Sequence, residues 1–236
     1  MKKSEQYLRG VKVALPVILG YLPVAIAFAV MASEVGFTPF EIISMSVLVF
    51  AGASQIMAVG MIGTGAPMIT VVVATFVLNL RHFIMGSYIM KRLGKTSAVQ
   101  KITTAHGITD EAFAIIGATP DSLCTVPYLF GIITVTYGSW IVGTAIGALV
   151  SVLIPPVVSD ALGIALFALF ISLLVPGIKK SWRLITLVCF TGLLNSVLTW
   201  LLPDNASSWA IIISCIVGAL VGVFFVRDEE SEVASE

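Results

Sequence analysis

Seven long apolar segments constrain the fold of this chain more than any other feature. They cover about residues 13–32, 42–63, 67–90, 127–154, 160–176, 182–202 and 209–226. A transmembrane helix needs about 20 mostly apolar residues, and backbone groups inside a bilayer must find their hydrogen bonds within the chain. We therefore predict an all-α integral membrane protein with about seven hydrophobic helical segments in a single domain, residues 1–236.

The composition agrees with a protein embedded in a lipid bilayer. Hydrophobic residues make up 58% of the chain and charged residues 11%, against about 25% charged residues in a typical soluble domain. Lys+Arg and Asp+Glu number 13 each, so the net charge gives no sign of a nucleic-acid partner. Cys124, Cys189 and Cys215 lack the spacing of a metal site. We expect them to pack as small apolar residues, with no metal, cofactor or disulfide.

Basic residues indicate how the chain is oriented. Four of them in residues 1–12 place a short N-terminus in the cytoplasm. Three plain crossings would then put the basic cluster Lys91–Lys101 outside, against the same rule. Either an early segment is broken or re-entrant, which we favour, or the stretch His106–Pro120 crosses back. At the other end, the acidic tail 227–236 is predicted to be disordered.

Proline and glycine indicate where a segment breaks. The first segment contains Pro16, Gly20 and Pro23, which fit either ordinary kinks or a functional break. In the second segment the run Ala51–Gln55 places the polar Ser54 and Gln55 beside small residues. Transporters build sites at the membrane midplane from such discontinuous helices, so we favour a functional break here.

A polar group interrupts the third segment at Asn79, Arg81 and His82. A charge in hydrocarbon costs at least a few kcal/mol, so such residues face a cavity or pair with one another. Arg81 either extends toward the membrane interface or faces inward, where its planar guanidinium binds a carboxylate or pairs with an acid.

A second polar group follows at residues 106–111. Asp110 and Glu111 either stabilise the first turn of a helix that begins near Thr109, or accept a proton or a substrate ammonium. His82 and His106 either titrate near neutral pH or are satisfied structural residues.

Small residues recur every four positions in two segments. One series contains Ser139, Gly143, Gly147 and Ser151, and the other Ser214, Gly218 and Gly222. Such spacing lets helices approach closely. The contact is either packing within this chain or an interface with a second membrane subunit or another copy.

Enzyme motifs are absent from the sequence. There is no HExxH zinc motif, no GxSxG nucleophile motif and no phosphate-binding loop that ends in Lys-Ser or Lys-Thr. We therefore predict no catalytic residues and no ATPase in this chain. A carrier driven by a gradient needs neither.

Five motifs in order resemble the AzlC family over about residues 10–175. They are Pro16–Phe28, Ala51–Gln55, Asn79–Gly86, Thr109–Ala114 and Ser139–Gly147. Ala29 departs from the glycine of many relatives, a conservative change. The resemblance implies the large subunit of a bacterial branched-chain amino acid exporter in the inner (plasma) membrane, with a small AzlD-type membrane protein as its partner.

The resemblance and the polar residues together predict a proton-coupled antiporter that exports Val, Leu and Ile, with Met as a further candidate. The substrate is a zwitterion with an apolar tail. Arg81, or free N–H groups at the Ala51–Gln55 break, would bind its carboxylate. The predicted substrate-binding residues are Phe28, Gly52, Ser54, Gln55, Asn79 and Arg81. The predicted proton-coupling residues are His82, Asp110 and Glu111.

Two alternatives remain open at this point. The chain is a membrane scaffold or sensor subunit that transports nothing, or it exports a different small solute. The polar interruptions of the apolar segments disfavour a scaffold, because a scaffold needs no polar groups at membrane depth. An intramembrane enzyme is disfavoured by the missing catalytic motifs.

Overall fold

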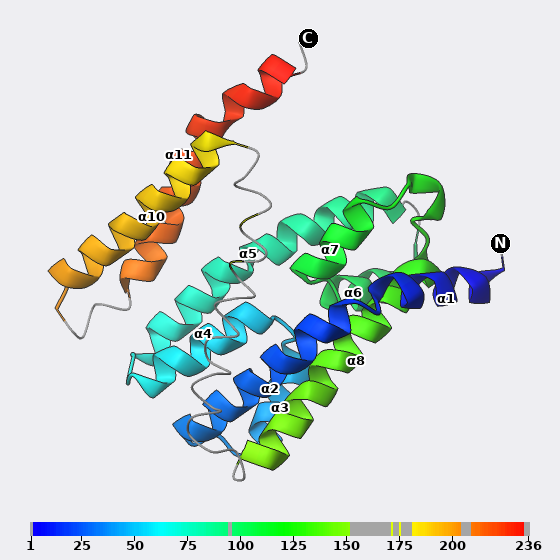
Figure 1. Cartoon of the computed structure of the whole chain (residues 1–236), viewed down its shortest axis with the longest axis horizontal. Coiled ribbons are helices and arrows are strands. Elements are labelled where there is room, and N and C mark those ends of the chain that lie inside the picture. Colours follow the sequence, from blue (N-terminus) through cyan, green and yellow to red (C-terminus); the bar gives the residue numbers. More distant parts are fainter. Residues whose placement is uncertain are drawn as a thin grey trace. The chain divides into compact units, whose positions relative to one another are not determined.

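The computed structural model describes residues 2–93, 96–151, 181–203 and 209–233, together with Ile171 and Val175. Every regular element in these residues is a helix (Figure 1), so the all-α membrane fold is confirmed. The elements are α1 (Lys3–Ala14), α2 (Val17–Val35), α3 (Pro39–Leu48), α4 (Gly52–Gly63), α5 (Met68–Leu93), α6 (Ala98–His106), α7 (Asp110–Gly117), the short 3₁₀ helix η1 (Asp121–Leu123), α8 (Val126–Val150), α10 (Trp182–Leu201) and α11 (Trp209–Val233).

The helices differ in number from the seven predicted segments. Within the described residues, four helices, α2, α5, α8 and α10, are long and apolar enough to cross a membrane. The first predicted segment begins four residues too early, because Pro16 separates α1 from α2. Helix α11 continues to Val233, into the tail that was predicted to be disordered. The predicted segment 160–176 lies outside the described residues apart from Ile171 and Val175.

The chain divides into two compact units. The first contains Met1–Gly60 and Leu78–Leu166, and the second contains Met61–Val77 and Phe167–Glu236. The single domain stays a prediction.

In the first unit, α1, α2 and α3 all pack along α8 (Figure 1). Glycines allow this close approach. A Cβ on Gly147 would lie 2.7 Å from the Ile26 carbonyl oxygen, and one on Gly143 would lie 2.8 Å from the Ala25 Cβ. Both glycines therefore pack α8 against α2 within this chain, as the first alternative for this series predicted.

The second predicted segment is broken, as its sequence predicted. Helix α3 ends at Leu48 and α4 begins at Gly52. Between them Phe50 has φ of 44°, a left-handed conformation that is uncommon for a bulky residue. The Tyr137 hydroxyl donates to the Val47 carbonyl oxygen at 2.8 Å, so a carbonyl freed at the end of α3 keeps a partner.

The broken halves are short. Helix α3 has 10 residues and α4 has 12, whereas a crossing helix needs about 20. Helix α7, with eight residues, is shorter still. The stretch His106–Pro120 therefore supplies no further helix of crossing length. Of the two explanations for the basic cluster Lys91–Lys101, a broken second segment is the one that fits these helix lengths.

The start of α3 is fixed by a reciprocal cap. Thr38 donates its backbone N–H to Glu41 Oε2 at 2.8 Å, and the Thr38 hydroxyl accepts from the Glu41 backbone N–H at 3.4 Å. The bonds from the Thr38 N–H and hydroxyl lower the pKa of the Glu41 carboxyl, because they favour its charged form.

Arg92 joins the end of α5 to the end of α7. Its guanidinium donates to the carbonyl oxygens of Ile116 at 2.6 Å and Thr119 at 2.5 Å. Its Nε donates to Asp121 Oδ1 at 2.8 Å. These carbonyls lie where α7 leaves groups without helical partners, so Arg92 closes that end of the helix.

Replacing Arg92 should destabilise this junction. We expect Arg92→Ala to lower the free energy of unfolding by about 1–3 kcal/mol, because it removes a charged donor from several partly buried acceptors. Thermal unfolding of the purified protein in detergent measures the change. The neighbouring Lys91→Ala removes an exposed charge and should have little effect. Equal stability of the two variants would contradict this role.

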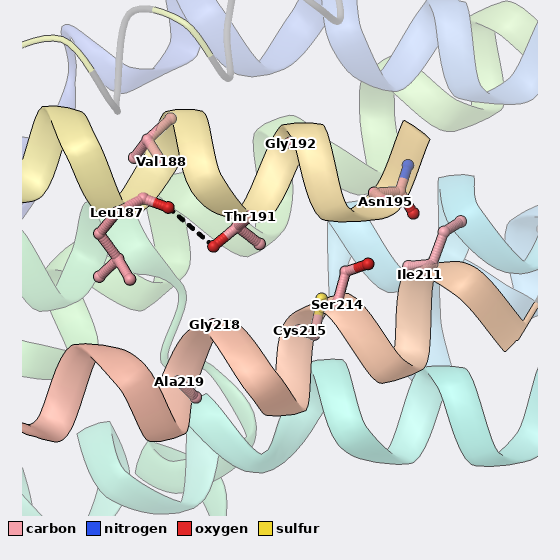
Figure 2. A pocket seen from close by; sticks show the side chains of 10 residues that line it. All are labelled: Leu187, Val188, Thr191, Gly192, Asn195, Ile211, Ser214, Cys215, Gly218 and Ala219. Atoms are coloured by element: carbon pink, nitrogen blue, oxygen red, sulfur yellow. Dashed lines mark hydrogen bonds between the residues drawn. The ribbon is translucent and has the colours of Figure 1, made fainter. Parts of the chain in front are cut away.

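The second unit contains α10 and α11, which pack against each other over a groove of about 490 Å³ (Figure 2). A Cβ on Gly218 would lie 2.6 Å from Thr191 Oγ1, and one on Gly222 would lie 2.9 Å from Leu187 Cδ2. These two glycines of the second small-residue series therefore pack α11 against α10, again within the chain.

Candidate functional site

A buried polar network holds the α3–α4 break in place. Gln55 of α4 donates from Nε2 to the Ser46 hydroxyl of α3 at 3.1 Å. Ser46 shares a second hydrogen bond of 2.9 Å with Thr144 of α8. Gln55 Oε1 accepts from the Ala51 backbone N–H at 3.1 Å. One side chain thus ties both sides of the break together, and α3 to α8 through Ser46.

A second branch of this network reaches α5. Asn79 donates from Nδ2 to Ser54 Oγ at 3.0 Å, and Ser54 donates to the Ala51 carbonyl oxygen at 3.0 Å. Asn79 Oδ1 is buried and has no hydrogen-bond partner among the described residues. The structure thus brings together three predicted substrate-binding residues. The polar groups of Ser54 and Gln55 already hold the broken backbone, a structural role that the sequence did not predict for them.

Arg81 and Asp110 form an ion pair, with 2.5 Å between Nη1 and Oδ2. The two side chains are 32% and 34% exposed, so the pair is neither on an open surface nor sealed off. Arg81 Nε is buried without a partner in the described part of the chain. The guanidinium therefore pairs with an acid, one of the alternatives left open by the sequence, and keeps one donor unused.

The start of α7 places Glu111 against α2. Thr109 caps the helix, since its hydroxyl accepts from the Ala112 backbone N–H at 3.3 Å. The buried Tyr21 hydroxyl lies 2.7 Å from Thr109 Oγ1 and also hydrogen-bonds the Glu111 carboxylate. Sequence reasoning did not assign Tyr21 a role, and its place in the Pro16–Phe28 motif was the only signal.

An aromatic group surrounds the start of α4. Trp140 of α8 lies edge-on to Tyr21, with ring centroids 5.5 Å apart, and stacks on Phe28 at 6.2 Å. A Cβ on Gly52 would lie 2.9 Å from Trp140 Cη2, so Gly52 permits the close approach. Trp140 Nε1 is buried without a partner in the described ranges. The sequence predicted roles for Phe28 and Gly52 and missed Trp140, which joins them.

A cavity of about 170 Å³ opens beside the break. Its lining consists of Val49, Phe50, Ala51, Asn79, His82, Ala105, His106 and Ile108. The Phe50 ring also contacts Tyr137 and lies 6.4 Å from the His106 ring, centroid to centroid. Both histidines thus line one cavity, although 24 positions separate them. No hydrogen bond to either imidazole is found in the described part of the chain.

The site combines one guanidinium, two carboxylates, two imidazoles and a broken helix in an apolar chain. Such a set can bind a small molecule that carries both charges, and its titratable groups can exchange protons. Within residues 2–93, 96–151, 181–203 and 209–233, no group of three or more His, Cys, Asp or Glu is arranged to hold a metal ion.

These features define an all-helical integral membrane protein with a polar site at a discontinuous helix, the arrangement of many membrane transporters. The family model described as AzlC protein matches residues 16–154, more than half of the chain. The chain belongs to the AzlC family, a family of membrane proteins associated with transport.

Relatives lie in bacteria and archaea. The inner membrane protein YgaZ of Escherichia coli strain K12 is 31% identical over 231 residues, which cover 94% of this chain and 93% of that protein. A membrane protein of Archaeoglobus fulgidus is 32% identical over 185 residues, covering 76% and 79%. The branched-chain amino acid transport protein AzlC of Bacillus subtilis strain 168 is 26% identical over 138 residues, covering 57% and 54%. No solved structure gives a significant match.

Proposed function

We propose that this chain exports apolar amino acids, Val, Leu and Ile above all with Met as a further candidate, as the large subunit of a two-component carrier. The observation that carries the proposal is the α3–α4 break, which is held by a buried polar network. The Arg81–Asp110 ion pair lies in the same unit of the protein. The name of the Bacillus subtilis relative supports this class of substrate. A carrier of this kind is not an enzyme.

The site offers a group for each part of an amino acid. Arg81 has an unused Nε donor for the carboxylate, and the N-terminus of α4 at Gly52 adds N–H groups with a favourable helix dipole. Phe28 is buried and stacks on Trp140, so the tail would contact it only after a rearrangement of this aromatic group. The polar groups of Ser54, Gln55 and Asn79 would bind the ammonium. Ser54 and Gln55 would first have to give up a hydrogen bond that they make in this structure.

Proton coupling follows from competition for Arg81. Asp110 and the substrate carboxylate are both anions that suit the same guanidinium. A proton on Asp110 removes one competitor and frees Arg81 for substrate, so proton and amino acid movements become linked. Glu111, held by Tyr21, and His82, which lines the adjacent cavity, are the other coupling candidates. The pair accounts for proton coupling, and the antiport direction is proposed from the family resemblance alone.

The assembly and its place in the cell are proposed from the family and from charge. The partner is a small AzlD-type membrane protein, and the location is the inner (plasma) membrane. The basic residues of the segment 1–12 place the N-terminus in the cytoplasm. Neither small-residue series leaves its glycines free for the partner, because Gly143, Gly147, Gly218 and Gly222 pack within the chain.

Counterflow of labelled amino acids tests the proposal. Proteoliposomes with this chain and its small partner are loaded with unlabelled leucine, and uptake of labelled valine, leucine and methionine is measured. We expect transient accumulation of label above equilibrium, and none in vesicles without this chain. No accumulation of any of the three would favour the scaffold alternative or a different solute.

Removing the acids should separate transport from its pH dependence. We expect Asp110→Asn or Glu111→Gln to abolish the dependence of leucine efflux on an imposed pH gradient, because a neutral side chain cannot exchange the proton. Leucine counterflow without a gradient serves as the control for folded protein. If both variants retain gradient-dependent efflux, neither residue couples protons.

A further inference from the structure

The cavity beside the α3–α4 break contains three polar acceptors that nothing in the described chain uses. Asn79 Oδ1 is buried without a partner, and no hydrogen bond to His82 or His106 is found in the described residues. A buried polar atom is nearly always hydrogen-bonded in native proteins, so the unused Asn79 Oδ1 indicates a ligand that supplies a donor. The half-buried His82 and the exposed His106 line the same cavity and add two more acceptors for that ligand.

We propose that this cavity binds the α-ammonium group of the transported amino acid, with Asn79 Oδ1 and one ring nitrogen each of His82 and His106 as acceptors. An ammonium group carries three N–H donors and no acceptor, and each neutral imidazole offers one acceptor nitrogen. Donors and acceptors therefore match in number. This inference rests on the proposed function and names the residues that recognise the substrate.

The rest of the cavity suits the carbon atoms beside the ammonium. Val49, Phe50 and Ile108 give it an apolar wall. Its volume is about 170 Å³, and a cavity of roughly 150 Å³ already holds a benzene molecule. The cavity thus has room for an ammonium together with a short aliphatic chain.

The assignment also resolves a conflict in the site. Ser54 and Gln55, the residues expected to bind the ammonium, are already used by the broken backbone. Asn79 has its Nδ2 fixed by Ser54, which leaves Oδ1 as the free end of a held amide. His82 follows three positions after Asn79 on α5, so the two side chains lie on one face of the helix and both line the cavity.

The test compares leucine with α-hydroxyisocaproate, in which a hydroxyl replaces the ammonium. Both are used as unlabelled competitors of labelled leucine counterflow in proteoliposomes with both subunits. For the wild type we expect leucine to compete about 100-fold better, because a site built for three N–H donors and a positive charge rejects an analogue that offers one neutral hydroxyl donor. This ratio does not depend on how much protein is folded.

Asn79→Leu and His106→Leu should each reduce the preference for leucine over α-hydroxyisocaproate about tenfold or more. Each substitution removes an acceptor that binds the ammonium and no other part of the substrate. His106 is exposed at the end of α6, so its replacement does not threaten the fold. Asn195→Leu is the matched control, since Asn195 lies on α10 in the other unit and lines a different groove. It should keep the wild-type ratio.

Two failures can be told apart. If the wild type shows leucine counterflow but Asn79→Leu and His106→Leu both keep its ratio, the ammonium site is wrong and the proposed function stands. If the wild type shows no counterflow of any apolar amino acid, the proposed function falls, and the ammonium site falls with it.

Discussion

Arg81→Gln should reduce leucine counterflow by about a hundredfold. Two anions depend on this guanidinium in our account, Asp110 in the resting site and the substrate carboxylate during transport. Removing a charged hydrogen-bond donor typically costs about 1.5–3 kcal/mol, and each 1.4 kcal/mol is a factor of ten. Counterflow in proteoliposomes measures the loss directly.

A lysine at this position separates charge from geometry. Arg81→Lys keeps the positive charge but loses the planar pair of donors that matches a carboxylate, so we expect an intermediate rate. Lys101→Gln removes one positive charge from an exposed position on α6 and should transport normally. Normal counterflow by Arg81→Gln would remove Arg81 from the site, and normal counterflow by Arg81→Lys would show that bidentate binding is not required.

Gly131→Leu should prevent stable folding of the first unit. A Cβ at Gly131 would overlap the Tyr7 carbonyl oxygen and lie 2.8 Å from the Val11 backbone nitrogen. The obstacle is backbone on both sides, so no side-chain rotation relieves it. We expect a loss of about 3 kcal/mol or more in the free energy of unfolding, seen as a lower melting temperature of the detergent-purified protein.

Gly138→Leu provides the matched control on the same helix. No atom lies within 4 Å of a Cβ built at Gly138, so the same substitution meets open space. Its melting temperature should stay near the wild-type value, shifted only by the difference in helix propensity. If both variants melt alike, the close crossing of α1 and α8 at Gly131 is not what holds them together.

Local sequence was sufficient to predict the helix break. The run Ala51–Gln55 combines small residues with Ser54 and Gln55 inside an apolar segment, and α4 begins at Gly52 within that run. Glycine spacing likewise predicted helix packing, because a residue without Cβ marks where backbones approach. Both signals are local, so a single sequence contains them.

The contacts that define the site are not local. Tyr21 reaches Glu111 across 90 positions, and Trp140 meets Gly52 across 88. No pattern along the chain announces such pairs. The sequence showed that Arg81 needs a partner but did not distinguish a substrate carboxylate from an acid of the same chain, because both satisfy the same guanidinium.

The predicted roles of Arg81 and Asp110 change when the two are seen together. The sequence suggested separate functions, substrate binding for one and proton coupling for the other. Their ion pair links these functions, because protonation of Asp110 and binding of a carboxylate act on the same group. Coupling of proton binding to amino acid binding then needs no second site, which makes the pair the proposed centre of coupling.

The central claim is that amino acids bind beside the α3–α4 break, and substrate protection of a single cysteine tests it most directly. In a variant whose Cys124, Cys189 and Cys215 are replaced by alanine, Ala105→Cys places a thiol in the lining of the cavity. Ala98→Cys places one at the other end of α6, also exposed. We predict that leucine slows maleimide labelling at residue 105 and leaves labelling at residue 98 unchanged. Equal labelling rates at residue 105 with and without leucine, in protein that still performs counterflow, would contradict the account.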